Sequence, residues 1–400
     1  MTADSATAQP DQWASRWLAD GLDELIAIRR QLHAHPELSR AEFATTDLVV
    51  ERLRAVGLDP VRLPGTGAYC DVGGAGPAPD VVLRADLDAL PLQDEKDVPY
   101  RSTFPGVAHA CGHDVHTTVV LGAGLVLADQ AAREGLPGRV RLVFQPSEEL
   151  MPGGALDVIA AGAVEGARSV FALHCDPSIE VGGVGLKVGP LTAASDQLTM
   201  HLTGPGGHTS RPQNTVDLVY ALARVTADLP AALNRVIDPR AAMTLVWGMI
   251  SAGSAANAIP RSGLARGTLR MLDQEAWEGA PEVVRRLAAQ LAAPYGAEVQ
   301  VDYVRGVPPV INDVSAIEML TAAARAVLPA GAIVPAKQSL GGEDFGWYLA
   351  HAPGAMARLG VRRPGAPAYD LHQGSFDVDE GCIDVGVRLL VGTALEALRS

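Results

Sequence analysis

The chain has 400 residues, of which 48% are hydrophobic and 20% are charged, and its formal net charge is -14 at pH 7. This length predicts two domains rather than a single core, and the composition excludes a disordered chain. The acidic balance argues against a nucleic-acid partner, because phosphate binding needs a basic face. No run approaches the roughly 18 uninterrupted apolar residues of a membrane span, so the sequence predicts no contact with a membrane.

The cysteines are far apart and irregularly spaced, at Cys70, Cys111, Cys175 and Cys382. In a chain of this size they predict no disulfide framework, so we expect a reducing, cytoplasmic location. Residues 1–9 are small and polar, without the basic start and apolar run of a signal peptide. We expect them to form a disordered tail.

The first half of the chain alternates between helical and strand patterns. An apolar stripe predicts a helix over about 12–33 that Pro36 stops, and a second helix over about 41–56 ends at Gly57. Strands and a buried helix are then expected, the strands at 69–72, 81–85, 139–146 and 169–173 and the helix at 116–132. This alternation predicts an α/β domain with a largely parallel sheet flanked by helices.

The pattern changes from about Thr192. The predicted elements here are strands at 197–203, 244–250 and 263–272, and helices at 216–229 and 282–293. Strands that each come with a helix predict a smaller α+β domain inserted into the first one. We therefore expect a catalytic domain made of 1–191 and 305–400, and an inserted domain over 192–304.

The segment from His109 to His116, which reads His-Ala-Cys-Gly-His-Asp-Val-His, is the densest cluster of metal-binding residue types in the chain. The alternative is a buried cysteine among surface histidines, but only ten histidines occur in total, and the clustering favours a metal site. Cys111 and His113 are two residues apart. This spacing suits two bonds to one ion, or one bond to each of two adjacent ions.

Further side chains of this kind follow predicted strands, and open α/β sheets build their sites at the carboxyl ends of strands. Each has a structural alternative, as a surface carboxylate, a solvated glutamate pair or a core histidine. Together they favour one site, and the candidates are Asp86, Cys111, His113, Glu148, Glu149, His174 and His372.

The adjacent carboxylates Glu148 and Glu149 indicate a mechanism. At a strand end followed by a turn, one carboxylate can bind a metal ion while its neighbour does not. A carboxylate beside a metal-bound water is the arrangement for general-base hydrolysis, in which it takes the proton of the water and passes it to the leaving nitrogen.

The chain resembles the dinuclear-metal amidohydrolases of the aminoacylase and carboxypeptidase superfamily. The most similar branch contains hippurate hydrolase, the N-acyl-amino-acid amidohydrolases and the indole-acetyl-amino-acid hydrolases. Seven ordered motifs carry the resemblance, at residues 32–38 (LHAHPEL), 84–91 (RADLDALP), 109–116 (HACGHDVH), 145–149 (QPSEE), 206–210 (GGHTS), 341–345 (GGEDF) and 371–372 (LH).

The resemblance implies a set of five metal ligands, namely Cys111, His113, Glu149, His174 and His372. It implies that the thiolate of Cys111 bridges two divalent ions per subunit. Zinc and manganese are the expected metals, and cobalt and nickel also occur in the branch. Glu148 is implied as the general base, and Asp86 as a residue that orients a ligand. His109 and His116 are then expected to orient ligands or to pack rather than to bind metal.

The resemblance also implies that the inserted domain is a dimerisation and lid domain. His208 would reach the active site of the other subunit of a homodimer and stabilise the oxyanion, the alternative being a histidine of a turn. Asn257 and Arg270 correspond to positions that hold the α-carboxylate of the substrate, a task for which Arg266 is a nearby competitor.

The implied function is metal-dependent hydrolysis of N-acyl or N-aroyl amino acids to a carboxylic acid and a free amino acid. One alternative function is that of a dipeptidase, a carboxypeptidase or a cell-wall amide hydrolase that uses the same dinuclear site. Another is a metal-binding protein without catalysis, but structural sites are usually closed and four-coordinate. A glutamate next to a ligand glutamate argues against that alternative.

Overall fold

The computed structural model describes residues 10–74, 76 and 78–399, so the tail expected at 1–9 lies outside the described residues. The chain forms two compact units. The first comprises Met1–Leu191, Ile311–Lys337 and Asp344–Ser400, and the second Thr192–Val310 and Gln338–Glu343. The end of the inserted domain expected at 304 therefore falls inside the second unit.

The first unit is built on a sheet with the strand order β1-β2-β4-β3-β5-β16-β6-β15. Its strands are β1 (Val61–Arg62), β2 (Ala68–Val72), β3 (Val81–Asp86), β4 (Val140–Gln145), β5 (Ser169–Glu180), β6 (Val184–Leu186), β15 (Ile333–Pro335) and β16 (Gly354–Arg362). The central strands β4, β3, β5 and β16 are mutually parallel, whereas β2 and β6 join this centre in antiparallel pairs.

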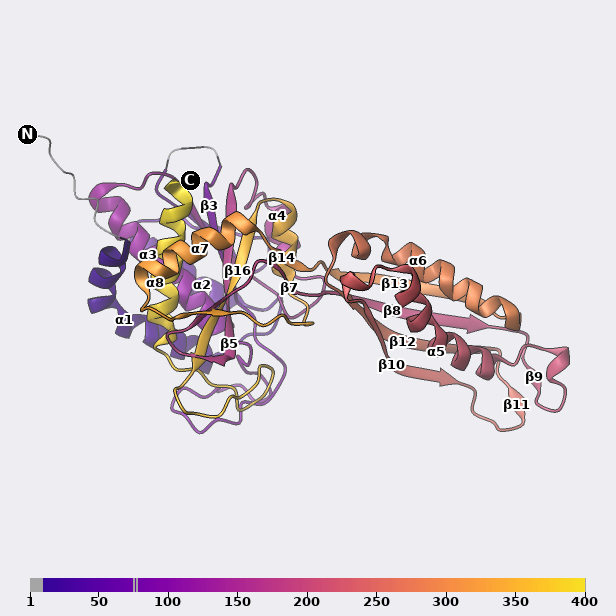
Figure 1. Cartoon of the computed structure of the whole chain (residues 1–400). Helices are drawn as coiled ribbons and strands as arrows, with labels where there is room; N and C mark the ends of the chain where they lie inside the picture. Colours follow the sequence, from indigo (N-terminus) through magenta and orange to yellow (C-terminus); the bar gives the residue numbers. More distant parts are fainter. Residues whose placement is uncertain (1–9, 75, 77, 400) are drawn as a thin grey trace, which may run out of the picture. The chain divides into compact units, whose positions relative to one another are not determined.

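Helices cover this sheet, and α1, α3, α7 and α8 pack against one another on one side of it (Figure 1). The helices of the unit are α1 (Pro10–Ala34), α2 (Phe43–Ala55), α3 (His113–Glu134), α4 (Ala155–Ala160), α7 (Val314–Val327) and α8 (Cys382–Arg399), with a 3-10 helix η4 (Asp344–Ala350). The short strands β7 (Gly189–Thr192) and β14 (Val310–Asn312) lie where the chain passes between the units. The expected α/β class is confirmed.

The helix α3 runs through the hydrophobic core, and most of its residues are buried. It is the one helix in the described part of the chain that is long and apolar enough to cross a membrane, and 83% of its apolar window is buried inside the fold. Burial on nearly all sides explains why its sequence lacks an amphipathic pattern.

The second unit is a four-stranded antiparallel sheet in the order β10-β12-β8-β13 with two helices. Its elements are β8 (Ala194–Thr203), β10 (Thr244–Ala252), β12 (Ser262–Met271), β13 (Glu298–Val307), α5 (Leu218–Val236) and α6 (Gln274–Ala292). The short strands β9 (Gly207–His208) and β11 (Ala258–Ile259) pair with each other, and the 3-10 helices are η1 (Pro212–Asn214), η2 (Pro239–Ala241) and η3 (Ala293–Tyr295).

The predictions differ from the structure most at prolines and at long strands. α5 continues through Pro230 to Val236, and α6 begins at Gln274, ahead of Pro281, because the side chain of Asp273 caps it by accepting the N–H of Ala276. β13 was not predicted. β5 extends to Glu180, so His174 lies inside a strand and not after its end.

Candidate metal centre

A tight turn delivers Cys111 and His113 to the start of α3. Gly112, between them, has a left-handed backbone with φ 89° and is the N-cap of the helix. A β-carbon at this position would lie 2.6 Å from the sulfur of Cys175, so only glycine fits both the backbone and the space. His113 is the first residue of α3, and both Cys111 and His113 are buried.

The glutamate pair follows β4 in a turn held by carboxylates. Ser147 has φ 56°, and its N–H donates to Glu42 over 2.7 Å. The next two backbone amides, those of Glu148 and Glu149, donate to the two carboxylate oxygens of Asp88 over 3.0 and 2.9 Å. Three successive N–H groups are thereby satisfied by buried acids, which holds the backbone at both glutamates.

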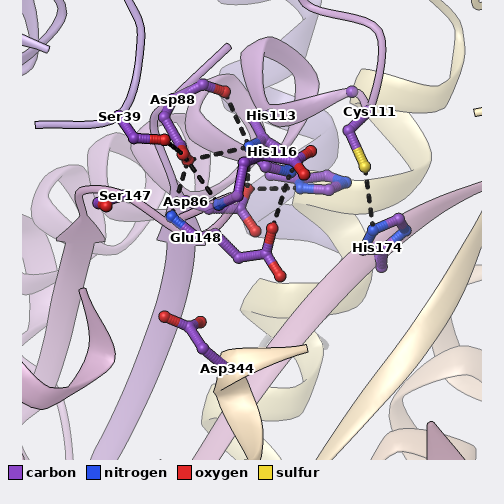
Figure 2. Close-up of polar contacts among 12 residues, drawn as sticks. Ser39, Asp86, Asp88, Cys111, His113, His116, Ser147, Glu148, His174 and Asp344 are labelled. Carbon is purple, nitrogen blue, oxygen red and sulfur yellow. Dashed lines mark hydrogen bonds and ion pairs between the residues drawn. The ribbon is translucent and has the colours of Figure 1, made fainter. Parts of the chain in front are cut away.

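Ligand-type atoms of the described residues converge into five groups, and two of these groups share Cys111. One group is Cys111, His113 and His174, and the other is Cys111, Glu149 and His372, with the ligand atoms of each within 4.8 Å of one another. The sulfur of Cys111 lies 3.6 Å from Nε2 of His174 (Figure 2), and Nε2 of His372 lies 3.3 Å from Oε1 of Glu149. The structure thus brings all five expected ligands together.

The donor set of these residues fits a metal ion. Nε2 of His113 and Oε1 of Glu149 are buried, have no hydrogen-bond partner and lie 3.9 Å apart. Buried polar atoms without a partner are costly, and a shared cation would satisfy both. Burial, and then the charge of Glu149, raise the pKa of the Cys111 thiol. A metal ion would favour the thiolate instead.

Asp88 orients His113. Its backbone oxygen lies 2.9 Å from Nδ1 of His113, and one of its carboxylate oxygens lies 3.3 Å from the same nitrogen (Figure 2). Burial opposes ionisation of Asp88, but its hydrogen bonds with His113 and Ser39 hold the pKa of the carboxyl below its usual range. Asp88 was not among the predicted site residues, although it stands two positions after Asp86 and so on the same side of an extended chain.

Asp86 forms a hydrogen bond with His116, whereas Asp88 contacts His113. Oδ1 of Asp86 lies 2.7 Å from Nδ1 of His116 but 3.8 Å from Nδ1 of His113. Nε2 of His116 accepts the N–H of Cys175, the residue after His174. Both nitrogens of His116 are therefore occupied, so this histidine supports the backbone at His174 rather than presenting a ligand atom.

The charge of Asp86 is balanced by Arg84. The guanidinium donates to Asp86 over 2.6 Å and to Asp344 over 2.6 Å. Burial alone would raise the pKa of Asp86, but its interactions with His113, with the guanidinium of Arg84 and with His116 hold it well below its usual range. Asp344 belongs to the Gly-Gly-Glu-Asp-Phe motif, so this motif supports the site through Arg84.

His109 lies next to the site without a partner. Both of its ring nitrogens are buried and lack a hydrogen bond, and burial lowers the pKa of His109 to about 4. It belongs to none of the five groups of ligand-type atoms.

The remaining predicted residues belong to the second unit. His208 and Asn257 are exposed and adjacent, because β9 pairs with β11 and the N–H of Thr209 donates to the backbone oxygen of Asn257. Arg270 lies elsewhere in this unit, on β12, and its guanidinium donates to the backbone oxygen of Leu340 over 2.5 Å.

An α/β unit in which a thiol, imidazoles and carboxylates converge beside a second glutamate defines a metal-dependent hydrolase. The chain belongs to peptidase family M20/M25/M40, whose family model matches residues 82–396. The expected class, a metal-dependent amidohydrolase, is confirmed at this level.

Curated relatives match nearly the whole chain. The chain is 48% identical over 379 residues to a Rhodococcus jostii protein named putative glutamate–cysteine ligase 2-3, a match that covers 94% of the chain and 47% of that protein. The chain thus spans about half the length of this relative. It is 37% identical over 363 residues to the N-acetyl-L-cysteine deacetylase of Bacillus subtilis, covering 90% of the chain and 85% of the relative.

A solved structure shares the fold. The Bacillus subtilis protein YXEP, described as a dinuclear metal binding peptidase from the M20 family, superimposes with a TM-score of 0.83 at 32% identity. The match covers 95% of this chain and 98% of that one.

Proposed function

We propose that the chain hydrolyses the amide bond of N-acyl or N-aroyl amino acids and releases a carboxylic acid and a free amino acid. The observation that carries the proposal is that two groups of ligand-type atoms share Cys111 and lie beside Glu148. The similarity to an N-acetyl-L-cysteine deacetylase supports this substrate class.

Two divalent ions, zinc or manganese, would be held by Cys111 with His113 and His174, and by Cys111 with Glu149 and His372. The similarity to a dinuclear metal binding peptidase supports this pair of sites. When bound, such ions polarise the scissile carbonyl and make water more acidic. Cys111 is the one ligand common to both groups, which supports a bridging thiolate.

Glu148 is the proposed general base. One of its carboxylate oxygens lies 4.0 Å from Nε2 of His113, the nitrogen that faces the ligand atoms of the site (Figure 2). From there the carboxylate takes a proton from the attacking water and passes it to the leaving nitrogen of the amide. Asp88 holds the backbone of Glu148 and so fixes where this proton transfer occurs.

The second unit supplies the proposed substrate contacts. Arg270 and Asn257 would hold the α-carboxylate of the amino acid, and His208 would donate to the oxyanion in the other subunit of a homodimer. The edge strand β10 supports such a dimer, because Val246, Met249 and Ile250 on it are exposed apolar side chains. Exposed apolar edge strands favour pairing with another chain.

A cytoplasmic location is part of the proposal. Cys70, Cys111, Cys175 and Cys382 are all free and buried. Free thiols are typical of a reducing compartment.

The second candidate function is hydrolysis of peptides at the same site. The similarity to the solved structure of a dinuclear metal binding peptidase favours it. Assays of N-acetyl-L-cysteine, hippurate and a panel of dipeptides on one preparation separate the two. The proposal predicts turnover of the acyl-amino acids that a chelator abolishes and added metal restores. Hydrolysis of dipeptides alone would replace it with the peptidase.

A further inference from the structure

A buried arginine lies beside the metal centre, on the neighbouring strand. In the sheet register, Arg358 of β16 stands directly opposite His174 of β5 on one side and opposite Gly185 of β6 on the other. Residues directly opposite each other in a sheet point to the same face. A β-carbon built on Gly185 would lie 3.0 Å from that of Arg358, which agrees with this placement. Arg358 therefore shares the sheet face of a proposed metal ligand.

The guanidinium of Arg358 has no acidic partner. Five cationic side chains are buried among the residues that the structure describes, and four of them pair with carboxylates: Arg29 with Asp114, Arg84 with Asp86, Lys96 with Asp94 and Arg141 with Asp71. The fifth, Arg358, is 8% exposed, and no described residue forms a hydrogen bond or an ion pair with its side chain.

The nearest acid along the same face of β5 does not pair with Arg358. Asp176 is two residues after His174, and its carboxylate accepts the N–H of Ser178. Buried arginine is rare without a counter-charge, because an unpaired charge that is removed from water strongly destabilises the fold. The missing counter-charge points to an anionic ligand.

Arg358 is the register partner of His174 on the neighbouring strand, so it stands next to a proposed metal ligand. Cations bound at His174 would repel this guanidinium, which strengthens the need for an anion between or beside them. A carboxylate is the natural partner, because guanidinium pairs with it through two parallel hydrogen bonds.

We propose that Arg358 binds a carboxylate on the acyl side of the substrate, so that the enzyme prefers acyl groups with a second acid, of the succinyl or γ-glutamyl type. This inference rests on the proposed function. The α-carboxylate of the amino acid is already assigned there to Asn257 and Arg270 of the second unit. Arg358 belongs to the unit that holds the metal ligands, and the acyl group is the part of the substrate left for it.

The test compares N-succinyl and N-butyryl derivatives of one amino acid, which have the same number of acyl carbons but differ in the terminal carboxylate. The wild-type enzyme is expected to favour the succinyl substrate at least tenfold in kcat/KM. Arg358→Met should lower this ratio at least tenfold, and Arg358→Lys should lower it less. Arg325→Met, the same change at an exposed position of α7, is the control and should keep the wild-type ratio.

A binding measurement adds a readout that needs no turnover. Calorimetry on metal-free protein should detect succinate but not butyrate, and Arg358→Met should abolish the succinate signal. If Arg358→Met does not fold, Arg358→Lys and the two ligands on the wild-type protein decide. Equal kcat/KM for both substrates, or an unchanged ratio in a folded Arg358 variant, overturns the inference. If neither substrate is hydrolysed, the proposed function fails, and succinate binding still tests Arg358.

Discussion

The carboxylate of Asp88 accepts the backbone N–H of Glu148 over 3.0 Å, and its second oxygen accepts the N–H of Glu149 over 2.9 Å. One buried acid thus holds the backbone of the proposed general base and of a proposed ligand. The backbone oxygen of the same residue lies 2.9 Å from Nδ1 of His113. Asp88 is therefore a positioning residue for three members of the site.

Replacing Asp88 by Asn should lower activity while the protein still folds. The amide has one acceptor oxygen instead of two, so one of the two backbone N–H groups loses its partner. We expect kcat/KM to fall about 10–100-fold, the range typical of residues that orient metal ligands. Steady-state kinetics with metal analysis measure this. Asp20→Asn, at an exposed position of α1, is the matched control, and equal activity of the two variants would contradict the role of Asp88.

Glu148→Gln should separate proton transfer from metal binding. The variant keeps the size of the side chain but cannot accept the proton of the water, so kcat should fall by about 10²–10⁴-fold. Its metal content should equal that of the wild type, whereas Glu149→Gln should lose metal. Near-normal turnover by Glu148→Gln would remove this residue from the mechanism.

Much of the fold could be read from the sequence because the first unit follows simple rules. β3 and β4 are buried apolar runs, and Gly112 sits where the turn before α3 needs a left-handed residue. The five proposed ligands also lie together as expected. Cysteine and histidine are rare in this chain, so a dense cluster of the two indicates a metal site.

The errors have local physical causes. The predicted helices stop just before Pro230 and start just after Pro281, whereas α5 and α6 contain these prolines, because packing of their apolar faces outweighs the lost backbone hydrogen bonds. β5 continues past His174 because β16 pairs with it as far as Asp176 and again at Glu180. The length of a strand that is set by pairing with a distant strand cannot be predicted from a short stretch of sequence.

The buried contacts of the site were the least predictable part. Asp86 and Asp88 belong to one motif, yet only the structure assigns Asp86 to His116 and Asp88 to His113. Arg358 carried no sequence signal, because an arginine in an apolar strand becomes notable only when its lack of a partner is visible.

The buried acid Asp94 predicts a pH dependence of stability. Burial alone would raise the pKa of its carboxyl, but hydrogen bonds from His33, Lys96 and Ser102 hold it well below its usual range. The carboxylate therefore stabilises the fold above the unfolded pKa of about 3.9, and this stabilisation is lost as the pH falls through the folded value.

Asp94→Asn should lower the free energy of unfolding by about 2–4 kcal/mol at pH 7, because it leaves buried cationic groups without their acid. The difference from the wild type should shrink as the pH falls below about 4, the unfolded pKa of the carboxyl. Thermal unfolding of both proteins from neutral pH down to about pH 3 spans this range. A constant difference throughout would show that the ionised form of Asp94 is not what stabilises the fold.

The edge strand β10 predicts a way to break the proposed homodimer. Val246→Lys places a charge on an exposed apolar edge and should shift the protein from dimer to monomer in sedimentation. Val304→Lys, at a similarly exposed position on the opposite edge strand β13, is the control and should remain dimeric. If His208 acts across the dimer, the monomeric variant should also lose activity. A monomer with full activity would argue against that role.

The central claim is that hydrolysis depends on two divalent ions that share Cys111. The most direct measurement is metal content and hydrolysis of N-acetyl-L-cysteine and hippurate by the same preparation, before chelation, after chelation and after metal is returned. We predict two ions per chain, activity that disappears and returns with them, and loss of both ions in Cys111→Ala. Full activity in metal-free protein, or two ions still bound in Cys111→Ala, would contradict the claim.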